Sequence, residues 1–408
     1  MALDFTLDAQ DRSTAARAGR LTTVHGEVLT PAFMPVGTLG TVKTLAPDEL
    51  LGAGVDILLA NTYHLILRPG VETVRRMGGL HRFMGWPRAI LTDSGGFQVL
   101  SLSELRKVTA RGVEFRSHLD GSRRWMTPED AIRAQDELGT DIAMSFDEPV
   151  EATAPPEAVR AAVDRTLDWA ARGLAERTRL RAEGRGTMGL FGINQGAVEP
   201  AERKRCFESL AEMPFDGYAL GGLWVGEQRS CSLDMVEHDC ALFPVAKPRY
   251  LMGVGHPVDV IEAVARGVDL FDCVLPTRNA RRGTVFTSTG RLVVKNAAYA
   301  DDPRPLDPEC DCPVCRRFSR AYLRHLFAAG EMLGMRLASL HAVSHMVRLA
   351  RAARTAILEG RFQAFRMEVV ERFQGGERLA PVTGRHVTGR GQPADPRSST
   401  EEMLDDGE

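Results

Sequence analysis

Eight short apolar runs recur through the first 280 residues of this 408-residue chain, and stretches long enough for a helix separate them. Near-continuous apolar runs that alternate with amphipathic stretches are typical of a parallel sheet covered on both faces by helices. Eight such runs predict an α/β fold, a (β/α)8 or TIM barrel, and an open doubly wound sheet is the alternative that periodicity leaves. The predicted strands lie at residues 31–37, 55–61, 89–93, 141–147, 189–195, 217–222, 249–255 and 268–274.

Two of the intervening helices can be placed from their own signals. The segment from Thr127 to Asp130 offers a capping threonine, a first-turn proline and two acids, in the order that begins a helix. The amphipathic stretch at 157–181 follows two prolines and predicts a second, longer helix. Each of these helices connects two consecutive predicted strands, as a barrel requires.

Polar residues stand where the predicted strands end. Asp93, Asp147, Gln195, Gly222 and Asp272 all lie at or near the carboxyl end of an apolar run. In a barrel that end forms the rim on which active sites are built. One buried aspartate is more often a structural hydrogen-bonding residue. Several on the same rim favour a shared pocket.

The composition excludes several other classes of protein. Hydrophobic residues make up 44% and charged residues 26%, which is an ordinary globular balance and not that of a disordered chain. No apolar run approaches the roughly 18 residues of a membrane span, and the N-terminus lacks the pattern of a secretory signal. Seven cysteines without a regular disulfide framework favour a reducing compartment. We therefore expect a cytoplasmic protein that binds no membrane.

Charge is distributed unevenly along the chain. The formal net charge of −3 argues against strong nucleic-acid binding, yet residues 310–378 hold twelve Arg against six Asp or Glu. This excess is interpreted either as a solvated helical face or as a surface for an RNA backbone. The last eighteen residues carry six acids against the single Arg397, so they are predicted to be disordered.

A cysteine cluster predicts a metal site. Cys310, Cys312 and Cys315 follow the spacing C-x-C-x2-C, and His341 and His345 lie further along the chain. Three thiolates and one imidazole complete a tetrahedral Zn2+ shell with no open position, so the site should be structural. Either histidine is a possible fourth ligand, and incidental loop cysteines are the alternative to a metal site. Three further cysteines are predicted to be ordinary packing residues, namely Cys206, Cys231 and Cys240.

Longer strings of the sequence resemble one family from about residue 5 to about residue 375. They are Pro35-Val-Gly-Thr-Leu-Gly-Thr-Val-Lys43, Asn61-Thr-Tyr-His-Leu-Ile-Leu-Arg-Pro-Gly70, Thr92-Asp-Ser-Gly-Gly-Phe-Gln-Val99, Gly112-Val-Glu-Phe-Arg-Ser-His-Leu-Asp-Gly121, Phe146-Asp-Glu148, Gly221-Gly-Leu223, Tyr250-Leu-Met-Gly-Val-Gly255 and Phe271-Asp-Cys-Val-Leu-Pro-Thr-Arg278. With the cysteine cluster, they closely resemble the bacterial tRNA-guanine transglycosylases, also called queuine tRNA-ribosyltransferases.

The resemblance implies a barrel core over residues 1–300 and a zinc-binding subdomain with closing helices over 301–375, followed by the acidic tail at 376–408. It implies a pentosyltransferase that replaces guanine at the wobble position of tRNAs with a G-U-N anticodon. The incoming base would be 7-aminomethyl-7-deazaguanine, a precursor of queuosine, and the enzyme would be a homodimer. The family's Leu-His-Asn string aligns with Leu340-His341-Ala342, which favours His341 as the zinc ligand.

Roles for individual residues also follow from the resemblance. Asp272 matches the nucleophile that attacks the ribose C1′, and Asp93 matches the general acid/base, as retaining glycosyl transfer requires two carboxylates. The residues that match the base pocket are Asp93, Ser94, Gly95, Gly96, Phe97, Asp147, Gln195, Gly222 and Met252. The residues that match the RNA-contacting loops are Gly253, Val254, Gly255, His256, Pro257, Val258, Asp259, Thr277, Arg278, Asn279, Ala280 and Arg281. A wobble base must leave the anticodon stack to reach such a pocket, so base flipping is implied.

Four residues depart from the family pattern, namely Pro149, Asn194, Ala197 and Trp224. Trp224 stands where the family has a small residue, in the loop that borders the 7-substituent of the incoming base. We therefore hypothesise altered selectivity for that substituent. Three rival functions are a non-catalytic tRNA-binding partner subunit, an exchange enzyme for another nucleic-acid position, and a small-molecule glycosidase. The presence of both Asp93 and Asp272 argues against the first of these.

Overall fold

All eight predicted apolar runs form strands in the computed structural model, which describes residues 3–98 and 106–375. The strands are β4 (Ala32–Met34), β5 (Ile57–Ala60), β6 (Ala89–Thr92), β10 (Ile142–Met144), β11 (Gly189–Asn194), β12 (Gly217–Leu220), β13 (Arg249–Leu251) and β14 (Leu270–Asp272). They pair in parallel in the order β4–β14–β13–β12–β11–β10–β6–β5. A parallel bridge between Val36 and Leu59 joins the two ends of this order, so the sheet closes into a barrel. The predicted barrel is confirmed, and the open sheet is excluded.

The apolar character of the strands reflects burial on both faces. In β5, Ile57 and Leu59 belong to the hydrophobic cluster of the barrel interior, whereas Leu58 and Ala60 belong to a cluster that includes residues of the surrounding helices. Successive side chains of a strand point to opposite faces, so every position of such a strand must be apolar. This explains why the strands read as continuous runs without polar alternation.

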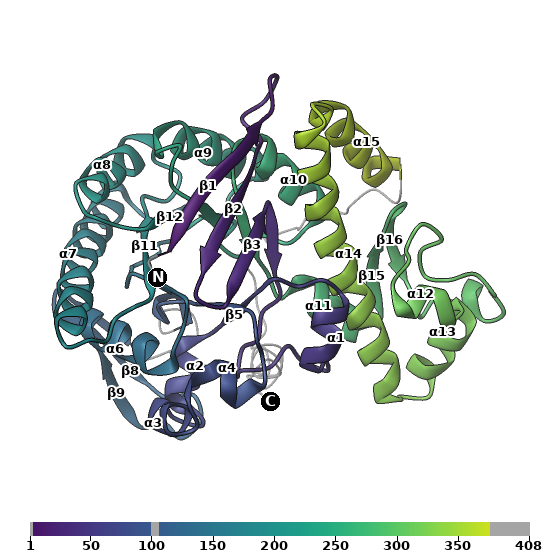
Figure 1. The fold of residues 1–408 in the computed structure, drawn as a ribbon, viewed down its shortest axis with the longest axis horizontal. Coiled ribbons are helices and arrows are strands. Elements are labelled where there is room, and N and C mark those ends of the chain that lie inside the picture. Colours follow the sequence, from purple (N-terminus) through teal and green to yellow (C-terminus); the bar gives the residue numbers. More distant parts are fainter. Residues whose placement is uncertain (1–2, 99–105, 376–408) are drawn as a thin grey trace, which may run out of the picture. The chain divides into compact units, whose positions relative to one another are not determined.

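Helices follow the strands and surround the barrel (Figure 1). They are α1 (Pro47–Gly52), α2 (Thr62–Leu67), α3 (Val71–Arg76), α4 (Gly79–Met84), α6 (Pro128–Leu138), α7 (Pro156–Ala182), α8 (Pro200–Ala211), α9 (Arg229–Leu242), α10 (Pro257–Ala265), α11 (Leu275–Arg281), α12 (Pro313–Arg317), α13 (Arg320–Ala328), α14 (Met332–Leu358) and α15 (Phe362–Gly375). Both predicted helices, α6 and α7, are present. Helix α6 begins with a capping box, in which the Thr127 hydroxyl accepts from Asp130 N and the Asp130 carboxylate accepts from Thr127 N.

A separate antiparallel sheet covers the amino-terminal end of the barrel strands. It consists of β1 (Asp4–Gln10), β2 (Arg17–Thr23) and β3 (Gly26–Thr30), and in Figure 1 it lies across the ring of helices. The buried Arg17 guanidinium pairs with Asp269, directly before β14, at 2.5 and 2.9 Å. This ion pair attaches the covering sheet to the amino-terminal end of the barrel. The carboxyl ends of the strands lie at the opposite end.

Two further small sheets are inserted between barrel elements. The first consists of β7 (Arg106–Thr109), β8 (Gly112–Arg116) and β9 (Arg123–Met126), and it precedes α6. The second is the hairpin of β15 (Thr284–Thr287) and β16 (Gly290–Val293), followed by the short 3-10 helix at Ala297–Tyr299. Helix α14 packs against α11, α12, α13 and β15, so this second insertion is joined to the barrel along one long helix.

Most arginines of the Arg-rich segment are paired within the chain. Ion pairs connect α14 and α15 to the barrel and its covering sheet: Arg351–Asp56, Arg354–Asp8, Arg336–Glu49 and Arg366–Glu262. Arg348, Arg320 and Arg372 pair with Asp307, Asp302 and Glu309. The charges of these arginines are therefore at least partly matched by neighbouring carboxylates, and the surface for an RNA backbone stays a prediction.

Within the described ranges, no helix combines the length and the apolar character needed to span a bilayer. The acidic tail predicted at 376–408 lies outside the described residues.

Candidate active site

Three aspartates meet at the carboxyl rim of the barrel. Asp93 directly follows β6, Asp147 lies three residues beyond β10, and Asp272 is the last residue of β14. Asp93 and Asp147 are buried, at 7% and 4% exposure. The charge of Asp272 acts on Asp93, and the charge of Asp93 acts on Asp147, so the three carboxylates share one electrostatic environment. The structure therefore brings the three predicted rim aspartates into one group, and a shared pocket around them stays a prediction.

Asp93 is held firmly by the start of α2. Its carboxylate accepts hydrogen bonds from Asn61 Nδ2 at 2.5 Å and from Thr62 N at 2.8 Å, and its carbonyl oxygen accepts from the Thr62 hydroxyl at 2.6 Å. Burial and the negative charge of Asp272 outweigh these bonds and raise the pKa of Asp93 to about 6. A carboxyl with such a pKa exchanges its proton near neutral pH, as a general acid/base must.

Asp147 is the acceptor of a second hydrogen-bonded set. Gln195 Nε2 donates to its Oδ2 at 2.7 Å and the Ser94 hydroxyl donates to its Oδ1 at 3.2 Å, while Gly96 N donates to Ser94 Oγ at 3.1 Å. Burial and the nearby charge of Asp93 raise the pKa of Asp147 to about 6. This buried acceptor suits a ligand edge that carries N–H donors.

Asp272 is oriented by two donors on one of its oxygens. The Tyr250 hydroxyl lies 2.6 Å and Gly253 N lies 2.7 Å from Asp272 Oδ1. Burial raises the pKa of Asp272, and these two hydrogen bonds oppose that rise because they stabilise the carboxylate. Burial and the charge of Asp272 raise the pKa of Tyr250 well above its usual range, so its hydroxyl stays a donor. Sequence reasoning missed Tyr250, whose hydroxyl inside an apolar strand was the available signal.

Two glycines shape the wall beside Gln195. Gly222 has a φ of +68°, and a Cβ at this position would lie 2.4 Å from Gln195 Oε1. A Cβ on Gly221 would lie 2.5 Å from Gln195 Nε2. Any side chain at either position would push the amide of Gln195 away from Asp147. Of the two predicted apolar residues, Phe97 is half-exposed and Met252 is partly buried.

A buried charged network supports the same wall from behind. The Arg203 guanidinium donates to the carbonyls of Gly221 at 3.1 Å and Ala197 at 3.0 Å, and it pairs with Asp239 at 2.6 Å. Asn194 Nδ2 donates to the same carboxylate at 2.9 Å. Arg203, Asp239 and Asn194 are fully buried. Asn194 stands out in the sequence as a departure, but its partner Asp239, 45 residues away, was missed.

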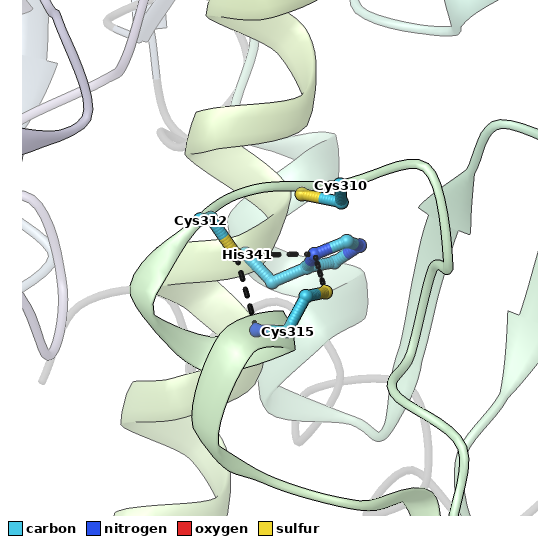
Figure 2. Close-up of side chains that lie close together, drawn as sticks. All are labelled: Cys310, Cys312, Cys315 and His341. Atoms are coloured by element: carbon cyan, nitrogen blue, oxygen red, sulfur yellow. Dashed lines mark hydrogen bonds between the residues drawn. The ribbon is translucent and has the colours of Figure 1, made fainter.

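The cysteine cluster is assembled from two separate segments. Cys310, Cys312 and Cys315 surround the start of α12, and His341 reaches them from α14 (Figure 2). His341 Nδ1 lies 3.3 Å from Cys315 Sγ and 3.7 Å from Cys312 Sγ. Its other nitrogen, Nε2, lies 2.9 Å from the Phe286 carbonyl oxygen. That carbonyl can accept a hydrogen bond from Nε2–H, which leaves the Nδ1 lone pair toward the sulfurs, so the four side chains could hold a metal ion.

The second candidate histidine does not join the cluster. The ring of His345 is centred 6.2 Å from that of His341, and the group of side chains able to share one ion contains His341 alone of the two. Of the cysteines predicted to be packing residues, Cys206 and Cys240 are buried, and burial raises the pKa of each thiol to about 12. Cys231 is exposed on α9, so that prediction is wrong for it.

Comparison with known proteins decides the family. The model of the queuine tRNA-ribosyltransferase family matches residues 11–375. The chain belongs to this family. A queuine tRNA-ribosyltransferase of Moorella thermoacetica is 53% identical over 376 residues, which is 92% of this chain and 99% of that protein. The proteins of the same name from Pelotomaculum thermopropionicum and Symbiobacterium thermophilum are 51% and 48% identical, over 92% and 97% of this chain and 100% and 98% of their own lengths.

The segments that the family resemblance assigns to RNA contact lie next to Asp272. Residues 253–259 lead from β13 into α10, and residues 277–281 are the end of α11, directly after β14. Many of their side chains are buried, among them Val254, Pro257, Asp259, Thr277 and Ala280. The exposed or partly buried positions of these segments are Gly253, His256, Val258, Arg278, Asn279 and Arg281.

The two remaining departures from the family pattern are Trp224 and Pro149. Trp224 has a φ of +58°, which strains a side chain of this size, and its indole packs against the largest hydrophobic cluster. Its backbone N–H donates to Glu227 Oε1 at 2.5 Å, and Val225 N donates to Glu227 Oε2 at 2.9 Å. Pro149 follows Glu148, whose carboxylate forms an ion pair with Arg165 of α7.

Proposed function

We propose that this protein exchanges guanine at the wobble position of tRNA for a 7-substituted 7-deazaguanine, in queuosine biosynthesis. The observation that carries this proposal is the group of three aspartates at the barrel rim of a queuine tRNA-ribosyltransferase family member, in which Asp272 acts on the buried Asp93 and Asp93 acts on the buried Asp147. Glycosyl transfer with retention requires a carboxylate nucleophile and a second carboxyl that moves a proton. Asp147 gives the pocket a third carboxylate for recognition of the base.

In the proposed reaction, Asp272 attacks the ribose C1′ and the bond from C1′ to guanine N9 breaks. The departing base takes a proton from Asp93, and the ribose remains bound to Asp272 as an ester. The incoming base then gives its N9 proton to Asp93 and attacks C1′, which releases the Asp272 carboxylate. The pKa of Asp93, raised to about 6, supports its two opposite roles, because the carboxyl must both release and regain a proton.

Asp147, Gln195 and Gly222 are proposed to bind the polar edge of the base, with Ser94, Gly95 and Gly96 closing that side. Asp147 would accept from the N–H donors of guanine, and the donors of Gln195 and Gly222 would meet its carbonyl oxygen. A base without those groups would leave the buried Asp147 unpaired, which costs about 1–3 kcal/mol. Phe97 and Met252 would pack on the two faces of the flat base.

We propose that the cysteine cluster holds one structural Zn2+ ion. In a tetrahedral zinc site, typical bond lengths place sulfur and nitrogen ligands roughly 3.6 Å apart, and His341 Nδ1 lies 3.3 and 3.7 Å from two of the sulfurs. Three thiolates and a neutral imidazole form a closed shell without a position for substrate. When bound, the ion would supply only cross-linking of α12 to α14, since all acid/base chemistry belongs to the rim aspartates.

The RNA partner is proposed to be a tRNA with a G-U-N anticodon, bound as the wobble nucleotide flips into the pocket. Gly253 to Asp259 and Thr277 to Arg281 would contact the bases and phosphates beside it, as these segments adjoin Asp272. We further propose a homodimer and 7-aminomethyl-7-deazaguanine as the incoming base. Light scattering of the purified protein tests the first, and competition between that base and labelled guanine tests the second.

Incorporation of labelled guanine into a G-U-N tRNA tests the exchange itself, with Asp272→Asn and the same tRNA carrying adenosine at the wobble position as controls. We expect incorporation only by the wild type and only into the guanosine-bearing tRNA. Retained tRNA binding without incorporation by the wild type would identify a non-catalytic binding subunit and refute the proposal.

A further inference from the structure

A second group of metal-binding side chains lies at the opposite end of the barrel from the aspartates. His25 occupies the turn between β2 and β3, His81 belongs to α4, and Asp141 directly precedes β10. His25 Nδ1 lies 2.8 Å from Asp141 Oδ1, and His81 Nε2 lies 3.1 Å from Asp141 Oδ2. The potential ligand atoms of the three residues all lie within 4.8 Å of one another.

The geometry of this group is fixed from several sides. The two imidazole rings stack with their centroids 3.5 Å apart and their planes within 15°. The backbone N–H of Ile90 donates to Asp141 Oδ2 at 2.9 Å and orients the carboxylate, which is almost fully buried, with 1% of its side chain exposed. Burial works to raise the pKa of Asp141, but hydrogen bonds from His81, His25 and Ile90 lower it, so the carboxylate is ionised at neutral pH.

The group is accessible and has space for further ligands on one side. The His25 side chain is 35% exposed and that of His81 is 13% exposed. A pocket of about 100 Å³ is lined by His25 and Asp141 and, among others, by Thr23, Asp136 and Thr140. This volume exceeds the roughly 10–15 Å³ that one water needs, so several water ligands fit beside His25 and Asp141.

We propose that His25, His81 and Asp141 bind a divalent transition-metal ion at the amino-terminal end of the barrel. Two imidazoles and one carboxylate are a donor set that favours zinc, nickel, cobalt or copper over magnesium and calcium. On binding, the ion takes the place of the proton between each imidazole nitrogen and Asp141. The displaced protons pass to the solvent or, within a neutral imidazole, to its other nitrogen. The bound ion joins the β2–β3 turn to α4 and β10, three elements far apart in the sequence.

Metal binding at this site does not depend on the proposed base exchange, and it is measured without any assay of guanine incorporation. Untagged protein with its cysteine-cluster ion in place is dialysed against low-micromolar Ni2+, and bound metals are counted by mass spectrometry. The variants are His25→Gln with His81→Gln, and the control His325→Gln, which changes an exposed histidine of α13. We expect one added nickel per chain in the wild type and the control, and at least about tenfold weaker nickel binding in the double variant.

The absorption spectrum of bound Co2+ tests the same site in the wild type, without need of the double variant. Co2+ titrated into the zinc-loaded wild type should give weak d–d absorption without a sulfur charge-transfer band, because this donor set contains no thiolate. Guanine incorporation by the folded double variant should equal that of the wild type, since these side chains lie at the far end of the barrel. No added metal in the wild type, undiminished binding in the double variant, or a sulfur band in the cobalt spectrum would each overturn the proposal.

Discussion

Replacing Asp93 by asparagine should abolish base exchange and, at the same time, stabilise the folded protein at neutral pH. Burial and the charge of Asp272 raise the pKa of Asp93 from 3.8 to about 6. The native state therefore holds this proton more tightly than the unfolded chain does. The stability that Asp93 contributes is fully present below pH 3.8 and is lost as the pH rises through 6.

The size of the expected gain follows from that shift. A pKa rise of about two units corresponds to about 3 kcal/mol of native-state destabilisation at pH 7 and above. An asparagine at this position would carry no charge and would avoid that cost. Its side-chain oxygen can still accept from Thr62 N, and Asn61 can turn its amide over to restore the second hydrogen bond. We therefore expect the free energy of unfolding to rise by up to about 3 kcal/mol at pH 8 and by about half as much at pH 5.

Urea unfolding at pH 5 and pH 8 measures this gain, followed through the fluorescence of the buried Trp86 and Trp169. Asp8→Asn is a control of opposite sign. Burial works to raise the pKa of Asp8, but its bonds to Arg354 and Arg20 lower it, so its loss should destabilise the protein at pH 8. The reasoning is refuted if Asp93→Asn is no more stable than the wild type at pH 8, or if its gain does not depend on pH.

Three other substitutions test the pocket. Tyr250→Phe removes a donor to Asp272, so the acid limb of the kcat–pH profile should move up by about one to two units, the effect of a hydrogen bond to a charged group. Gly222→Ala places a methyl group 2.4 Å from Gln195 Oε1, and the KM for guanine in steady-state incorporation should rise by at least about tenfold. Arg203→Met leaves a fully buried carboxylate without its counter-charge, and urea unfolding should show a loss of about 3–5 kcal/mol.

Each of these substitutions has a matched control. Tyr218→Phe changes a buried tyrosine that packs on Phe207 and Phe243, and it should leave the pH profile unmoved. Gly184→Ala repeats the backbone strain of a positive φ where no atom lies within 4 Å, and it should leave KM unchanged. Arg205→Met breaks partly exposed ion pairs and should cost less than about 1 kcal/mol. Equal effects in a test variant and its control would contradict the corresponding explanation.

The barrel and the rim residues could be predicted because their signals are local. A strand buried on both faces must be apolar throughout, so residues such as those of β5 stand out, and a polar residue such as Asp93 at the end of a run marks the rim. The choice of His341 over His345 came from the resemblance, because both histidines lie on the same helix. In the structure, only His341 lies close enough to the three cysteines to share an ion with them.

The missed elements lack such local signals. Strand β1 is half-buried and alternates between exposed and partly buried residues, and β9, Arg123–Met126, exposes three of its four residues. Neither contains an apolar run. The support of Asp272 by Tyr250, and of Gly221 by Arg203, connects residues 22 and 18 positions apart. Such pairings arise from the packing of neighbouring elements of the barrel, which no local pattern encodes.

Intact mass spectrometry of the enzyme quenched during turnover with a G-U-N tRNA tests the central claim most directly. If Asp272 is the nucleophile, the wild type should show an adduct whose mass is that of enzyme plus tRNA with guanine lost, and digestion should place the ribose ester on Asp272. Asp272→Asn should bind the tRNA and show no adduct. An adduct on another residue, or guanine exchange by Asp272→Asn at the wild-type rate, would contradict the account.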